Sequence, residues 1–179
     1  KTQSAGEVCL YLDAPPGATG MVNMSVVGMD VILRQAMEQG YAVGYFEAWD
    51  QYSLEGALRA AEESQAPAIL GFGGAVTDAA WLDGGGIEEL AALGRCLAER
   101  SRVPTALLFN EAQTLGQILR GLRAGCNAVM LDTSELPWEE NIAATAKVVE
   151  AAHALGATVE AELGHLADAS APDKAAPRL

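Results

Sequence analysis

The feature that most constrains this sequence is a repeating unit: a short apolar run, a polar loop and an amphipathic segment of helical length. Nearly continuous apolar runs are typical of strands that are covered on both faces, as in parallel sheets. The alternation therefore predicts an α/β fold with a parallel sheet. The predicted strands are Ala42–Phe46, Ala68–Phe72, Thr105–Phe109, Ala128–Leu131 and Thr158–Leu163.

The segments between these runs have apolar residues at helical spacing. The predicted helices are Asp30–Gln39, Leu54–Ser64, Ile87–Arg100, Thr114–Ala124 and Glu139–Leu155. Asp30 is placed to N-cap the first of them, and Gly125 and Gly156 follow two helix ends where a left-handed residue is needed. The predicted organisation is an N-terminal extension (1–27), an α/β domain (28–168), and a tail or the start of a mobile loop (169–179).

Two architectures are compatible with this alternation. One is a (β/α)8 barrel of the TIM type, incomplete here because only about five βα units are present. The other is an open, doubly wound parallel sheet, which about five strands would complete. Glycines follow the second strand at Gly71-Phe-Gly-Gly74, without the surrounding pattern of a nucleotide-binding loop. Local patterning does not separate the two architectures.

Charge and composition exclude several classes of function. The formal charge of −13 opposes binding to nucleic acid or to anionic lipid, and no apolar stretch approaches the roughly 20 residues that span a bilayer. The first residues lack the basic-then-apolar order of a secretory signal, and the three cysteines contain no CxxC pair, so we expect a cytoplasmic protein. Two histidines cannot form a three-histidine metal site.

Acidic and amide side chains gather where the predicted strands end. In parallel βα folds, ligands bind beyond these carboxyl ends. Glu160 and Glu162 alternate along one strand, so they are predicted to share a face that is no ordinary apolar core. Buried carboxylates are costly unless they are paired, protonated or bound to a cation, which indicates a site. The residues at strand ends are Glu47, Asn110, Glu111, Asp132, Glu160 and Glu162.

Several blocks, in this order and spacing, resemble the class II ketose-bisphosphate aldolases, related to the fructose- and tagatose-bisphosphate enzymes. They are Gly40-Tyr-Ala-Val-Gly-Tyr-Phe46, Ser53-Leu-Glu-Gly-Ala-Leu-Arg-Ala-Ala-Glu-Glu63, Ala66-Pro-Ala-Ile-Leu70, Met130-Leu-Asp-Thr-Ser134, Pro137-Trp-Glu-Glu-Asn-Ile142 and Val159-Glu-Ala-Glu-Leu-Gly164. The resemblance covers roughly 27–166 and implies a metal-dependent TIM barrel. Members of the family continue through about three more strands, with further metal-binding histidines and a glycine-rich phosphate site.

The resemblance also assigns residues, with one departure after the third strand. There the family carries a histidine, an apolar residue, the catalytic aspartate and another histidine, whereas this sequence has Leu108-Phe-Asn-Glu111. Asn110 thus stands at the position of the catalytic base, with Glu160 as a candidate substitute. The implied metal ligands are Glu111, Asp132 and Glu162, and the implied substrate contacts are Glu47, Ser134 and His165, although a solvated loop histidine is the alternative for His165. The family implies Zn2+, oxygen ligands favour Mg2+ or Mn2+, and a site without metal is a further alternative.

The resemblance implies a carbon–carbon lyase of carbohydrate metabolism, in glycolysis, that cleaves a phosphorylated ketose by a retro-aldol reaction in the complete parent protein. The alternative is an inactive homologue that binds a phosphosugar or serves as a structural subunit. An open-sheet binding module unrelated to the barrel is a third hypothesis, which strand order would decide. A partial barrel has two open sheet edges, so we also expect a homo-oligomer.

Overall fold

Five parallel strands lie next to one another in the order in which they occur in the chain, β1-β2-β3-β4-β5. The structure is a computed structural model that describes residues 25–73 and 77–164. The strands are β1 (Tyr45–Glu47), β2 (Ala68–Gly73), β3 (Thr105–Ala112), β4 (Ala128–Leu131) and β5 (Thr158–Glu160). A doubly wound sheet reverses its strand order at a switch point, and this sheet does not. The doubly wound alternative is therefore wrong, and the fold is a partial barrel.

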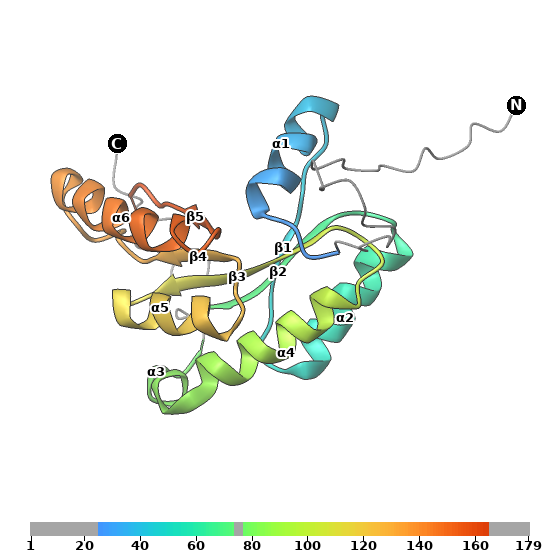
Figure 1. Cartoon of the computed structure of the whole chain (residues 1–179), viewed down its shortest axis with the longest axis horizontal. Coiled ribbons are helices and arrows are strands. Elements are labelled where there is room, and N and C mark those ends of the chain that lie inside the picture. Colours follow the sequence, from blue (N-terminus) through green and yellow to red (C-terminus); the bar gives the residue numbers. More distant parts are fainter. Residues whose placement is uncertain (1–24, 74–76, 165–179) are drawn as a thin grey trace, which may run out of the picture.

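Helices cover the outer face of this sheet (Figure 1). They are α2 (Gln51–Glu63), α4 (Ile87–Glu99), α5 (Leu115–Ala124) and α6 (Trp138–His153), and the short α3 (Ala79–Trp81) and a π-helical turn η1 (Leu82–Gly86) lead into α4. The main core lies between them and the strands, and at its centre the rings of Phe72 and Phe109 stack with centroids 4.9 Å apart. The continuous apolar runs predicted strands that are covered on both faces. In agreement, all six residues of β2 are buried.

The first helix, α1 (Met29–Gln39), lies on the opposite side of the sheet (Figure 1). Its Met29 and Ile32 pack against a smaller apolar cluster that includes Ile69, Ala106 and Leu108. These side chains come mostly from the first halves of the strands, so α1 covers the amino-terminal end of the inner face. The N-cap is Gly28 rather than Asp30, which sits in the first turn and pairs with Arg34 at 3.1 Å.

Five strand boundaries differ from the predicted ones, and β1 and β2 each end one residue later than predicted. The first strand begins at Tyr45, not Ala42, and β5 ends at Glu160, so Glu162 lies beyond the strand. The third strand continues to Ala112 through a β-bulge: Phe109 pairs with Val129 and Ala112 with Leu131, so β3 holds one extra residue. Glu111, inside the bulge, has a left-handed φ of 48°. This conformation is uncommon for a residue with a side chain and cannot be inferred from an apolar run.

Most of the predicted N-terminal extension (residues 1–24), the predicted tail at 169–179 and His165 lie outside the described residues. Gly125 and Gly156 have the positive φ values predicted for them, 121° and 71°. Within the ranges that the structure describes, no helix has both the length and the apolar character to cross a bilayer.

Candidate active site

The inner face of the sheet changes from apolar to polar along the strands. Because alternate residues share a face, Tyr45 and Glu47 on β1 lie on the same face as Leu108 and Asn110 on β3. Between them runs β2, whose Gly71 pairs with Glu47 and whose Gly73 pairs with Asn110. The apolar cluster under α1 therefore continues into a carboxylate, a phenol and an amide at the carboxyl ends of the strands.

The two glycines of β2 make room for these groups. A Cβ atom at Gly73 would lie 2.7 Å from Glu47 Oε1 and 3.4 Å from Asn110 Cβ. A Cβ atom at Gly71 would collide with the Leu108 carbonyl oxygen and lie 2.9 Å from the Tyr45 ring. The absence of side chains at these positions thus lets the Glu47 carboxyl reach across β2 toward Asn110.

The bulge in β3 adds Glu111 to the same group. In a regular strand Glu111 would face away from its neighbour Asn110, but a bulge re-aims the side chain that it carries. Burial raises the pKa values of Tyr45, Glu47 and Glu160, which come from the two edge strands, and the negative charge of Glu111 adds to each shift. We call Tyr45, Glu47, Asn110, Glu111 and Glu160 the inner cluster. Glu47, Asn110, Glu111 and Glu160 were each placed at a strand end from the sequence, and the structure brings these four residues together. Asp132, also placed at a strand end, lies in a separate group.

Burial and mutual repulsion both disfavour charge in the inner cluster. The pKa of Glu47 is raised, first by burial and then by Glu111, although contacts with Tyr45 and Asn110 partly offset the shift. The pKa of Glu160 is raised by the same two causes. Glu47 Oε1 and the Tyr45 hydroxyl are buried, and neither completes a hydrogen bond of good geometry within the described part of the chain. These carboxyls therefore hold protons to a higher pH than ordinary glutamates.

Asp132 and Ser134 form a second group, just beyond β4. The Ser134 hydroxyl and backbone N–H donate hydrogen bonds to Asp132 Oδ1 at 2.7 and 3.1 Å. Gln113 Nε2 contacts Asp132 Oδ2 at 3.4 Å and also donates to the Glu111 carbonyl oxygen at 3.1 Å. This second group therefore adjoins the inner cluster through the backbone of the bulge.

Glu162 joins the second group through a residue of α6. Asn141 Nδ2 donates to the Glu162 carbonyl oxygen at 2.9 Å and to the Thr133 carbonyl oxygen at 3.1 Å. Asn141 and Tyr45 are the two site residues that sequence reasoning missed. Asn141 was assigned to an ordinary helix start and Tyr45 to an apolar strand. The signal for Tyr45 was its spacing of two from Glu47, which places both on one face.

No three His, Cys, Asp or Glu side chains within 25–73 and 77–164 are grouped so that they could hold a metal ion. His165 lies outside these ranges. The metal set of Glu111, Asp132 and Glu162 stays a prediction.

The comparisons with known proteins agree with this geometry. Residues 27–176 match the family model for fructose-bisphosphate aldolase class-II. The chain belongs to this family. It is 41% identical over 144 residues to a fructose-bisphosphate aldolase of Thermus caldophilus, covering 80% of this chain and 45% of the relative. It is 40% identical over 143 residues to a probable fructose-bisphosphate aldolase of Bacillus subtilis, covering 79% and 49%.

Solved structures of the class share the fold of this family member. The crystal structure of the YdjI aldolase from Escherichia coli K12 aligns with a TM-score of 0.70 at 29% identity, covering 78% of this chain and 51% of that one. A putative fructose-1,6-bisphosphate aldolase from Coccidioides immitis aligns with a TM-score of 0.65 at 22% identity, covering 73% and 44%. The chain thus spans about half the length of the relatives and structures that it matches.

Proposed function

We propose that the protein to which this chain contributes is a carbon–carbon lyase that cleaves a phosphorylated ketose with the help of a divalent cation. The observation that carries the proposal is the meeting of Asn110 and Glu111 with Glu47 and Glu160, at the strand end where the family places its catalytic aspartate and a metal-binding histidine. In this chain Asn110 and Glu111 occupy these two positions. Both side chains carry oxygen atoms, so the positions are polar here as they are in the family.

The donor chemistry fits a hard divalent cation. Burial raises the pKa values of Glu47 and Glu160, and the nearby carboxylate of Glu111 raises them further, so a cation would relieve the repulsive part of the shift. Glu111, Asp132 and Glu162 are the proposed ligands. Because no three such side chains are grouped in the described residues, we expect substrate, water or residues elsewhere to complete the coordination. Such a cation, once bound, polarises the carbonyl of a ketose.

The side chains of this chain would handle the proton. In retro-aldol cleavage a base takes the hydroxyl proton, the electrons of the carbon–carbon bond move toward the carbonyl, and an aldehyde leaves. Asn110 cannot accept that proton, but its amide can orient the hydroxyl. Glu160, or Glu47 beside Asn110, is the proposed acceptor. Glu47, Ser134 and His165 are proposed to contact the sugar.

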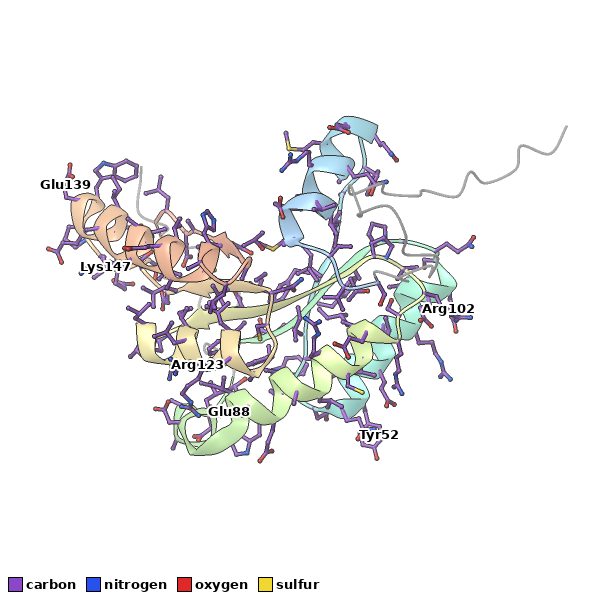
Figure 2. All side chains as sticks on the ribbon, in the orientation of Figure 1. Tyr52, Glu88, Arg102, Arg123, Glu139 and Lys147 are labelled. Atoms are coloured by element: carbon purple, nitrogen blue, oxygen red, sulfur yellow. The ribbon has the colours of Figure 1, made fainter. Side chains whose placement is uncertain are left out.

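The cation is tested by thermal unfolding. In a chain that also contains the remaining strands, Mg2+ or Mn2+ should raise the melting temperature more than Zn2+ does, by mass action on the folded state. Glu162→Gln should remove most of this increase. Glu139→Gln, at the exposed start of α6 (Figure 2), should not. If no divalent ion changes the melting temperature, and Glu162→Gln leaves stability unchanged or raises it, the cation is refuted.

The reaction is tested by following cleavage of fructose 1,6-bisphosphate in a chain that also contains the remaining strands. A second candidate function is an inactive homologue that binds a phosphosugar or acts as a structural subunit. Leu108 and Asn110 favour it, because neither can serve as a metal ligand of the family's kind or as a base. Binding of the sugar without cleavage would support this candidate and overturn the lyase.

We also propose self-association through the open edges of β1 and β5. Phe46 on β1 and Leu163 beyond β5 are exposed near these edges, and unpaired strand edges template pairing with another chain. A monodisperse monomer by light scattering, without binding of a hydrophobic dye, would contradict this. Free thiols at Cys96 and Cys126 support the proposed cytoplasmic location.

A further inference from the structure

One side chain joins the loops that follow β4 and β5. Asn141 lies in the first turn of α6, is only 7% exposed, and uses its Nδ2 group to bond two carbonyl oxygens. The Thr133 carbonyl belongs to the loop after β4, and the Glu162 carbonyl belongs to the segment after β5. Two backbone segments that are 29 residues apart in the sequence thus meet at one amide group.

The bond to Thr133 also organises the turn that holds Asp132 and Ser134. The Thr133 carbonyl oxygen accepts a second hydrogen bond, from the Leu136 N–H at 3.0 Å. Inside the same turn, Asp132 Oδ1 accepts the Ser134 N–H and hydroxyl. The Asn141 amide is itself oriented by Thr145, whose hydroxyl donates to Asn141 Oδ1 at 3.3 Å. Each polar atom of the Asn141 side chain therefore has a defined partner.

We propose that Asn141 is a positioning residue for the active site, which sets the separation of the Asp132–Ser134 turn and the Glu162 segment. This inference rests on the proposed function, in which Asp132 and Glu162 bind the cation and Ser134 contacts the sugar. The Asp132 N–H donates to the Ala112 carbonyl oxygen of β3 at 2.9 Å, whereas the pairing of β4 with β5 ends at Met130 and Glu160, before both loops. Outer-shell hydrogen bonds of this kind typically change metal affinity by roughly 10–100-fold when they are lost.

A second asparagine shows what a purely structural clamp looks like. Asn127, at the amino-terminal end of the sheet, donates from Nδ2 to the Val27 carbonyl oxygen at 2.7 Å and accepts the Leu107 N–H at 2.8 Å. It ties the chain before α1 to β3, at the end of the strands opposite to the site. Its removal should lower global stability without a specific effect on the loops after β4 and β5.

Hydrogen exchange uses the whole 179-residue chain, and cation binding uses a chain that also contains the remaining strands, each with the same two substitutions of Asn141. Asn141→Ala removes the amide, and Asn141→Asp keeps the size of the side chain but turns a carboxylate toward two carbonyl oxygens. Asn127→Ala is the matched control, because it removes an asparagine clamp at the opposite end of the strands and leaves both Asn141 Nδ2 bonds in place. Hydrogen exchange of the Ser134 and Leu136 amides, measured by NMR, reports the turn, and the Val129 amide in β4 reports global stability.

In both Asn141 variants we expect Ser134 and Leu136 to exchange about tenfold faster relative to Val129, the scale of one lost hydrogen bond. Mn2+ affinity, measured by titration calorimetry, should fall roughly 10–100-fold. The control should change neither. Unchanged relative exchange in Asn141→Ala, or wild-type behaviour of Asn141→Asp, would overturn the clamp.

The two proposals fail in different ways. If the unsubstituted chain binds Mn2+ and the Asn141 variants bind it equally well, the positioning role is refuted and the cation stands. If the chain that contains the remaining strands binds no Mn2+ without any substitution, the cation is refuted. In that case the positioning role falls with it, whereas faster exchange of the two amides would still establish the hydrogen-bond clamp.

Discussion

The outer and inner faces of the sheet differ in the residues that they bury: the outer face buries apolar side chains, and the inner face ends in acidic and polar ones. On the outer face, Leu70, Phe72 and Phe109 are fully buried against helices. On the inner face, the same strands end in acids whose burial raises their pKa values and in polar atoms that lack good hydrogen bonds. Unfavourable groups of this kind are retained where they serve a function. The comparison indicates that packing on the outer face stabilises the fold. The acids at the carboxyl end of the inner face lower that stability and form the candidate site.

The largest effect should come from the outer face. Phe109→Ala removes a buried ring that stacks on Phe72 and packs against Gly121, and it should cost about 3–5 kcal/mol of unfolding free energy. Phe46→Ala is the control, because Phe46 is 44% exposed on the edge strand, and it should cost far less. Urea denaturation measures both. Equal losses would show that the outer layer does not dominate stability.

Substitutions of the two inner-face glycines of β2 should lower the unfolding free energy by different amounts. Gly71→Ala should cost about 1–3 kcal/mol, because its Cβ meets the backbone of β3, which cannot move cheaply. Gly73→Ala should cost less, since its Cβ meets the end of the flexible Glu47 side chain. The same denaturation curves test this order. A larger loss at Gly73 would mean that the Glu47 carboxyl is held more rigidly than its contacts indicate.

These contrasts also show how far the sequence predicts the molecule. The strands of the outer layer were predicted because burial on both faces leaves an apolar run, and the sequential order matches the barrel that the family resemblance implied. The acids at strand ends were predicted because a charge at that point is chemically conspicuous. The bulge was not, because the left-handed φ of Glu111 has no signature in Leu108-Phe-Asn-Glu111. Asn141 was missed because its partners are carbonyl oxygens, which every residue has.

The smallest effect should come from the inner-cluster carboxyls, and its sign is opposite. Replacing Glu47 and Glu160 together by Gln removes two groups that are costly to ionise in the folded state. The double variant should therefore be more stable than the unsubstituted chain at pH 7. Both groups are partly exposed and screened by solvent, so we expect a gain of no more than about 1 kcal/mol. Thermal and urea unfolding at pH 7 measure this gain.

The pH dependence of that gain identifies its cause. A carboxyl with a raised pKa keeps its proton in the folded state at pH values where the unfolded chain has released it, so stability falls as pH rises through this window. The window opens near the ordinary glutamate pKa of about 4.3. The advantage of the double variant should be smallest below that pH, should grow through the window, and should level off above it.

Glu88→Gln is the control of opposite sign, because Arg120 lowers the pKa of Glu88 through hydrogen bonds of 2.6 and 2.7 Å. Stability from Glu88 is present above the ordinary value and is lost as pH falls, so this variant should lose stability at pH 7 and approach the unsubstituted chain in acid. Parallel pH profiles for the two variants would show that Glu47 and Glu160 are ordinary surface acids, and the contrast between the two faces would then reduce to packing alone.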